Sequence, residues 1–225
     1  FGCLKDEKFA DKMNDYIIFK NLEDKYVTLK DYLEIAKEKN HENQVFYVTD
    51  AIEQSQYINM FKDAELEAVY LTQAIDNPFM SQLEYKNEGV KFQRIDADVN
   101  DIFKEADAVT DEDAKTSLSE IFKAALGMEQ LDVKVENLKN AGLASMITVS
   151  EESRRIQEMM KMYSAQGMGM GADMFPVSET LVLNANNSLV KYVLAHKDGE
   201  HTAKICEQLY DLAKLAHGSL TPERM

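Results

Sequence analysis

The chain has 225 residues, of which 45% are hydrophobic and 29% charged, and a formal net charge of -15 at pH 7. This length holds one large domain or two small ones, and the negative charge argues against nucleic acid or an anionic membrane as the main partner. No apolar run approaches the ~18 residues of a membrane helix, no secretory signal opens the chain, and two distant cysteines, Cys3 and Cys206, indicate a cytoplasmic protein with unpaired thiols.

Residues 1–40 are predicted to form a helical lead-in. Apolar side chains across residues 6–21 stand close to helical spacing. Thr28 is placed to cap a second helix over residues 29–39.

From residue 44 the pattern changes to short apolar runs that are typical of strands buried on both faces. Strands are expected at 44–49, 68–72 and 90–95, with helices over 51–63 and from Pro78. Strands alternating with helices predict a small α/β unit, 41–98, with three layers and a short, mostly parallel sheet. A nucleotide site is not expected there, because no glycine lies between Gly2 and Gly89 to let backbone amides approach a phosphate.

Residues 96–113 carry eight carboxylates and one lysine, Lys104. The spacing fits no EF-hand loop, and we interpret the stretch as a solvated, partly helical acidic linker. It separates a first domain, 1–98, from a second, 99–225.

The second domain is predicted to be α+β. A helix over 111–126 ends at Gly127, and strands follow at 131–135, 144–149 and 180–183. Two further helices are expected at about 187–196 and 202–217.

Six of the 12 methionines fall between residues 159 and 174, on an expected helix and a glycine-rich loop that contains Met168 and Met170. Met159, Met162 and Tyr163 form an apolar line beside the one that would pack on the sheet. Methionine is flexible and polarizable, which suits an adaptable apolar binding surface. Core methionines followed by a floppy loop remain the plainer interpretation.

No catalytic constellation is evident. The four histidines are expected to be solvated, no serine stands in a Gly-x-Ser-x-Gly turn, and neither cysteine has a basic neighbour in sequence. The histidines are His41, His196, His201 and His217. No metal site is predicted.

Five short sequence segments are distinctive. They are Thr28-Leu29-Lys30-Asp31-Tyr32, Val45-Phe46-Tyr47-Val48-Thr49, Glu67-Ala68-Val69-Tyr70-Leu71-Thr72 with Ile75-Asp76, Leu183-Asn184-Ala185-Asn186-Asn187-Ser188 and Leu212-Ala213-Lys214-Leu215-Ala216-His217-Gly218. Together these segments resemble the heat-shock protein 90 chaperone family, bacterial HtpG type, and the resemblance spans the whole chain in order.

The resemblance implies the latter part of the family's middle domain followed by its C-terminal dimerisation domain. ATP and magnesium would bind upstream, so this piece would hold no cofactor and would not be an enzyme, whereas its parent would be an ATPase. The chain starts at Phe1 and stops after the helix-start signals Thr221 and Pro222, which also led us to expect a fragment.

The resemblance further implies that non-native client proteins contact Met159, Met162 and Tyr163, and the loop residues Met168 and Met170 extend that surface. A second family contact follows the Ile75-Asp76 pair and often carries a tryptophan. This chain has none, and Phe79 and Met80 are weak substitutes. A homodimer would form through the last two helices, weakened here because the final one is cut. The dimerisation candidates are Ile205, Leu209, Leu212, Leu215 and Ala216.

Two alternatives stay open. A purely structural dimerisation module would keep Met159 and Met162 in its interior. A small-molecule enzyme on the α/β unit would need the glycine turn and acid–base cluster that the sequence lacks.

Overall fold

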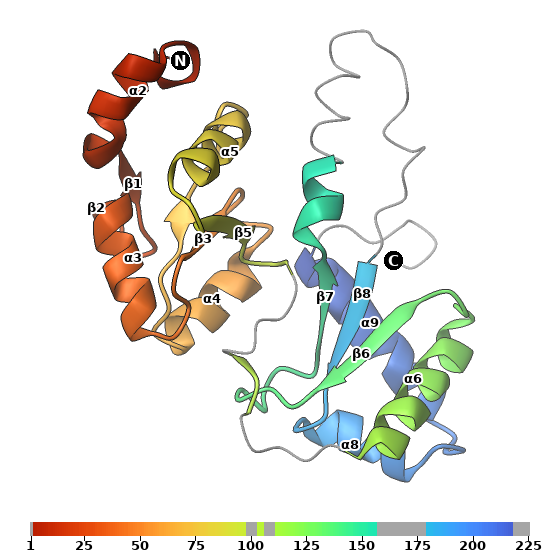
Figure 1. The fold of residues 1–225 in the computed structure, drawn as a ribbon. Helices are drawn as coiled ribbons and strands as arrows, with labels where there is room; N and C mark the ends of the chain where they lie inside the picture. Colours follow the sequence, from red (N-terminus) through yellow and green to blue (C-terminus); the bar gives the residue numbers. More distant parts are fainter. Residues whose placement is uncertain (1, 98–102, 106–110, 157–178, 218–225) are drawn as a thin grey trace, which may run out of the picture. The chain divides into compact units, whose positions relative to one another are not determined.

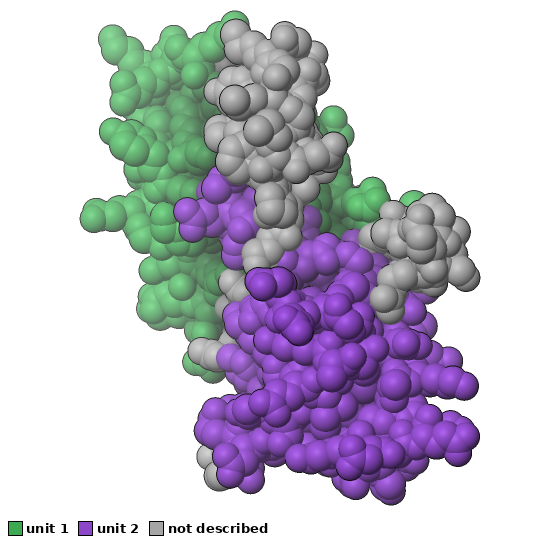
Figure 2. Space-filling model, turned by 90° about the vertical axis from the view of Figure 1, so that its right-hand side faces the viewer, with its two compact units in different colours: residues 1–95 green, residues 96–225 purple. Residues whose placement is uncertain are grey.

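The computed structural model describes residues 2–97, 103–105, 111–156 and 179–217. It divides into two compact units, Phe1–Ile95 (unit 1) and Asp96–Met225 (unit 2), coloured separately in Figure 2. Both mix helices with small sheets, as the sequence predicts. Across the described ranges, no helix is both long enough and apolar enough to span a bilayer.

Unit 1 opens with short helices and a β-hairpin, where the sequence predicted one helix over 6–21. A turn over residues 21–25 joins the two strands of the hairpin. The Asn21 side chain stabilises it by accepting hydrogen bonds from the amides of Glu23 and Lys25, and Asp24 adopts φ +63°. The helical prediction is therefore wrong beyond residue 16. The elements are α1 (Gly2–Lys5), α2 (Glu7–Met13), the 3-10 turn η1 (Asn14–Tyr16), β1 (Ile18–Lys20) and β2 (Tyr26–Thr28).

The α/β part of unit 1 follows the predicted order of elements. Thr28 caps α3 in a reciprocal pair with Asp31, as expected from the sequence. All strand pairings of the three-stranded sheet are parallel, in the order β4-β3-β5. The elements are α3 (Leu29–Glu38), β3 (Gln44–Val48), α4 (Ser55–Asp63), β4 (Val69–Tyr70), α5 (Asp76–Lys86) and β5 (Lys91–Arg94).

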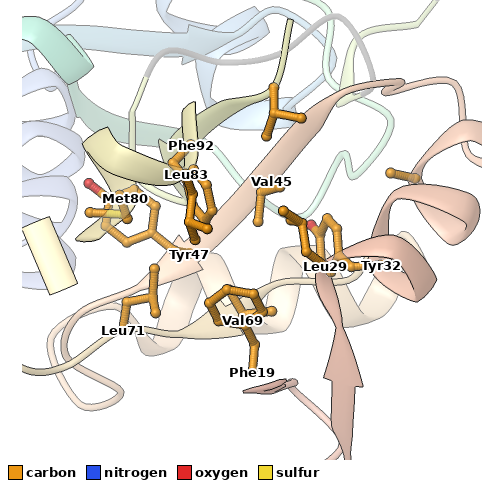
Figure 3. Close-up of a cluster of buried hydrophobic side chains, with 12 residues drawn as sticks. Phe19, Leu29, Tyr32, Val45, Tyr47, Val69, Leu71, Met80, Leu83 and Phe92 are labelled. Carbon is orange, nitrogen blue, oxygen red and sulfur yellow. The ribbon is translucent and has the colours of Figure 1, made fainter. Parts of the chain in front are cut away.

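The core of unit 1 lies between this sheet, α3, α5 and the hairpin (Figure 3). Tyr32 is fully buried, and its hydroxyl is satisfied on both sides: it accepts from the amide of Phe46 and donates to the carbonyl of Glu67. Burial raises the pKa of Tyr32, which keeps the hydroxyl a donor. The other members are Phe19, Leu29, Ala36, Val45, Tyr47, Val69, Leu71, Met80, Leu83, Val90 and Phe92.

Unit 2 is a three-stranded mixed sheet packed with helices. Its order is β6-β8-β7, with β8 parallel to β6 and antiparallel to β7. Gly127 ends α6 at φ +65°, as predicted. Helix α9 packs on β7 and on α6 (Figure 1). The elements are α6 (Glu112–Leu126), β6 (Asp132–Glu136), β7 (Ser145–Val149), β8 (Glu179–Asn184), α8 (Ser188–Ala195) and α9 (Thr202–His217).

Asn184, at the end of β8, joins two loops of unit 2. Its side-chain oxygen accepts from the amides of Leu138 and Asn186, and its amide nitrogen donates to the carbonyls of Asn140 and Leu143. The side chain is fully buried. All four polar positions of this amide are therefore used.

The described parts of the acidic stretch only partly match the solvated, partly helical linker expected from the sequence: Glu105 and residues 111–113 are exposed and α6 begins at Glu112, whereas residues 96–97 and 103–104 are held in unit 2. Asp96 and Ala97 are buried. Lys104 forms a β-bridge with Leu138 and an ion pair with Glu136 at 3.1 Å. Backbone pairing and an ion pair can hold an acidic segment that composition alone marks as solvated.

Candidate functional site

Helix α9 has one face in the core of unit 2 and another that is exposed. The inward face contributes Cys206, Leu209, Tyr210 and Ala213 to the core. Among the dimerisation candidates, Leu209 is therefore buried, Ile205 is partly buried against that core, and Ala216 is half-buried. Leu212 and Leu215 are 62% and 52% exposed. The outward part of the stripe thus consists chiefly of these two leucines.

Helix α8, which packs against α9, adds a second exposed apolar pair that our sequence analysis did not select. Leu189 is 47% and Tyr192 40% exposed. The Tyr192 ring stacks on His196, with ring centroids 4.1 Å apart. The three-residue spacing of Leu189 and Tyr192 places them on neighbouring positions of one helix face, and this signal could have identified them.

The methionine-rich candidates Met159, Met162, Tyr163, Met168 and Met170 lie outside the described residues. The structure describes a helical segment over 151–156, directly after β7, and the helix expected at 159–163 falls outside the described residues. The Ser150 hydroxyl accepts from the amide of Ser153 and so caps the start of this segment.

A buried charged cluster, which sequence reasoning missed, holds this helix start. One guanidinium nitrogen (Nη2) of Arg154 lies 2.9 Å from Asp96 Oδ2 and 3.3 Å from His217 Nε2. His217 Nδ1 lies 3.8 Å from the same carboxylate oxygen. The Asp96 side chain is 1% exposed and the other two are 11% exposed.

Two of the four histidines contradict the expectation that all are solvated. His217 is largely buried in the cluster, and His41 is buried against Phe46, with ring centroids 5.2 Å apart. Burial lowers the pKa of His41, which favours the neutral ring. His196 and His201 are exposed, as expected.

In unit 1, the two substitutes for the family's tryptophan differ in burial. Met80 is 2% exposed and belongs to the core (Figure 3), whereas Phe79 is partly buried and packs against that core. Both lie near the start of α5. Only Phe79 retains part of its side chain at the surface.

In the turn between β3 and α4 of unit 1, backbone N–H groups donate hydrogen bonds to side chains of the same turn. Gln54 Oε1 accepts from the amides of Thr49 and Asp50, and Asp50 Oδ1 accepts from those of Ile52 and Glu53. These N–H groups are the donors that a phosphate would require. Among the described residues, no group of three or more His, Cys, Asp or Glu side chains is arranged to hold a metal ion.

Comparison with known proteins identifies similar chains over nearly the whole length. A family model described as Hsp90 protein matches residues 1–224. A chaperone protein htpG of Bacteroides fragilis (strain YCH46) is 32% identical over 229 residues, which cover 95% of this chain and 33% of that protein.

A chaperone protein HtpG of Porphyromonas gingivalis (strain ATCC 33277) is 27% identical over 233 residues, covering 96% of this chain and 34% of the relative. One from Psychrobacter arcticus is 26% identical over 195 residues, covering 81% and 28%. The chain therefore spans about a third of the length of the curated relatives it matches.

Proposed function

Because the chain belongs to the Hsp90 protein family, of the bacterial HtpG type, we propose that it is the client-binding and dimerising part of an ATP-dependent stress chaperone. The family resemblance seen in the sequence is confirmed by the match over residues 1–224. The relatives' names give chaperone activity to those proteins, and we extend it to this chain. ATP and magnesium are proposed to act in the whole protein.

The observation that carries the dimerisation proposal is the exposure of Leu212 and Leu215 on a helix whose other face is core. In a two-fold symmetric dimer the same patch contributes twice, so four leucines become buried. At about 1.5–3 kcal/mol for each full burial, the gross gain is at most about 6–12 kcal/mol. Association costs about 4–15 kcal/mol, so this patch alone supports a weak dimer.

Sedimentation equilibrium at micromolar concentration tests dimerisation. We expect the 225-residue chain to be mainly monomeric or weakly dimeric, and the whole protein to be a stable dimer. Leu212→Ser with Leu215→Ser should weaken association of the whole protein, and Lys204→Ser, at an exposed position of α9, should not. A tight dimer that tolerates the double substitution would refute the proposed interface.

The client-binding proposal places non-native proteins on Met159, Met162, Tyr163, Met168 and Met170. Replacing Met162 with serine should reduce the suppression of client aggregation by the whole protein and leave its melting temperature nearly unchanged. A loss of about 2 kcal/mol or more in stability would instead assign Met162 to a core, as a purely structural module requires.

Phe79 provides the second proposed client contact, since part of its side chain remains at the surface. Phe79→Ser should therefore weaken client binding. Met80→Ser should mainly destabilise unit 1, because Met80 is a core residue. Equal effects of both substitutions on client binding at unchanged stability would argue against this distinction.

We also propose that the 225-residue chain does not bind ATP. The occupied amides of the turn at Thr49 and Asp50 support this proposal, because phosphate would have to displace Gln54 as their acceptor. Calorimetric titration with ATP and magnesium should show no saturable heat, whereas micromolar binding that maps to this turn would overturn the proposal.

A further inference from the structure

Strand β6 is an edge of the sheet in unit 2. Within the described residues it pairs with β8, in the order β6-β8-β7, and helix α6 lies beside it (Figure 1). A strand at the edge of a sheet presents backbone N–H and C=O groups on its outer side, where another extended chain can pair with them.

The backbone groups of β6 point alternately toward β8 and toward the outer edge. The carbonyl of Glu136 accepts from the amide of Ala185, directly after β8, so Glu136 faces β8. Because the direction alternates from residue to residue, Val133 and Val135 direct their N–H and C=O groups to the outer edge. In the described part of unit 2, no strand or side chain pairs with these outward groups.

The loop that follows β6 already pairs on this outer side with residues 103–105. The amide of Glu105 donates to the carbonyl of Asn137 at 2.8 Å, and the bridge is antiparallel, with Lys104 opposite Leu138. Asn137 is odd-numbered like the two valines, so this pairing lies on the same side as their outward groups. The edge therefore accepts an extended chain just beyond β6.

A groove of about 540 Å³ lies between α6 and this edge. Its volume is within the range of protein binding sites. Val133 and Val135 line it from the strand, and Thr116 and Ser119 line it from the helix. The groove thus has room beside the outward backbone groups of β6.

Basic residues outnumber acidic ones in the groove, whereas the whole chain has 40 acidic and 25 basic residues. The Glu136 carboxylate is paired with Lys104 at 3.1 Å, and Lys115 forms a pair with the exposed Glu112 at 2.8 Å. An exposed pair of the second kind contributes little, so a bound carboxylate can replace Glu112. The charged residues that line the groove are Lys115, Lys123, Lys134, Glu120 and Glu136.

We propose that the outer edge of β6 binds an extended acidic peptide segment by strand addition. Val133 and Val135 provide the backbone hydrogen bonds, which give affinity. Lys115 and Lys123 lie on the α6 side, and Lys134 lies on the other face of the sheet from the two valines. The side chains of an added strand alternate between these two faces, so lysines meet its carboxylates on both.

Fluorescence anisotropy of the 225-residue chain with a labelled heptapeptide of alternating glutamate and valine tests this site. None of its residues belongs to the client-binding or dimerisation surfaces proposed above, so it can fail separately from them. We expect saturable binding that weakens with added salt. In hydrogen–deuterium exchange, the bound peptide should slow the outward amides of Val133 and Val135 and leave β7 unchanged.

Two further peptides separate backbone pairing from charge attraction. A heptapeptide of alternating lysine and valine should not bind measurably, because it opposes the lysines of the groove. The glutamate–valine peptide with N-methylated backbone amides keeps its charges but loses its backbone donors, and it should bind at least tenfold more weakly.

Two sets of variants test the protein side. Lys123→Gln with Lys134→Gln should raise the Kd of the acidic peptide about fivefold, since exposed ion pairs each contribute little. The control, Lys191→Gln with Lys204→Gln, changes the net charge equally at exposed positions of α8 and α9 and should leave the Kd unchanged. Val133→Pro removes an N–H on the outer edge and none from the pairing with β8, so it should weaken binding about tenfold or more while β8 keeps its protection.

Four outcomes would overturn the proposal. They are absence of saturable binding, equal binding of the N-methylated peptide, protection by the acidic peptide at sites other than β6, and protection of the valine amides that rises with protein concentration alone. The second would show attraction by charge only, and the last would show that the edge pairs with a second copy of the chain. If Val133→Pro fails to fold, the N-methylated peptide still tests the same pairing.

Discussion

Replacing Asn184 with alanine should destabilise unit 2 by about 3–5 kcal/mol. The substitution removes four hydrogen bonds of 2.7–3.1 Å: three join the loop at Leu138–Leu143 to the end of β8, and the fourth is a local bond from the amide of Asn186. Each is worth about 1 kcal/mol net, and the buried amide of Leu138 would be left without its side-chain acceptor. Against a typical stability of about 5–15 kcal/mol, this is a large fraction.

The measurement needs a signal from unit 2 alone. Cys206 is fully buried in that unit's core, so brief thiol labelling during a denaturant titration reports its opening. A Cys3→Ser background removes the other thiol. The control is Asn140→Ala, because Asn140 Oδ1 accepts one bond from Gly142 at an exposed position. That variant should lose about 1 kcal/mol or less.

Asn184→Asp separates the two halves of the amide. It keeps acceptors for Leu138 and Asn186, but it places a carboxylate oxygen against the carbonyls of Asn140 and Leu143. At neutral pH its stability should fall at least as far as that of the alanine variant, with partial recovery in acid, where the carboxyl can donate one bond. An alanine variant that loses less than about 1.5 kcal/mol, or an aspartate variant as stable as wild type, would refute this reasoning.

Burial raises the pKa of the Glu67 carboxyl in the folded chain, although a hydrogen bond with Asn21 acts in the opposite direction. The contribution of Glu67 to the free energy of unfolding is therefore greatest below its pKa in the unfolded chain, and it falls as pH rises through its pKa in the folded chain. Glu67→Gln should therefore raise the melting temperature at neutral pH and have little effect near about pH 4, and equal shifts at both would contradict this sign. Burial also raises the pKa of Cys206 to about 11, so a disulfide reagent should titrate only Cys3 in the native chain and both thiols after unfolding. Gly127→Ala should lower the stability of unit 2 by about 1 kcal/mol in a denaturant titration, because the φ of +65° at this position strains an alanine. The added methyl group itself meets no heavy atom within 4 Å apart from the residue and its chain neighbours. An unchanged unfolding midpoint would argue against backbone strain.

Periodic segments with clear end signals were predictable from sequence. Helix α9 has the predicted bounds 202–217, and α6 ends at Gly127 as expected. The alternation of apolar strands and helices also predicted the parallel sheet of unit 1. In these cases local propensity and tertiary packing favour the same structure.

The hairpin of β1 and β2 was missed because its turn has no glycine. Asn21 supplies the turn with its side chain, and Asp24 takes the left-handed conformation itself. The short run Ile17-Ile18-Phe19 satisfies helical and strand patterns alike, so periodicity could not decide between them.

The charged cluster could not be predicted from sequence. Arg154 is 58 residues from Asp96 and 63 from His217, and no local pattern marks any of the three as buried. Burial of Met80 and exposure of Leu212 likewise depend on which face each helix turns to its neighbours. The dimerisation stripe was visible as a period, but its division into core and surface required the fold.

The position of β8 determines when unit 2 can form during synthesis. Within the described part of unit 2, β6 and β7 each pair with β8, which is the last of the three strands to be made. Asp132 of β6 pairs with Thr180 of β8, 48 residues later in the chain. In unit 1 the order is reversed, because the central strand β3 is made first and β4 and β5 then add to it. A chain emerging from the ribosome can therefore complete the sheet of unit 1 early, while β6 and β7 remain without sheet partners until residue 184 has left the exit tunnel.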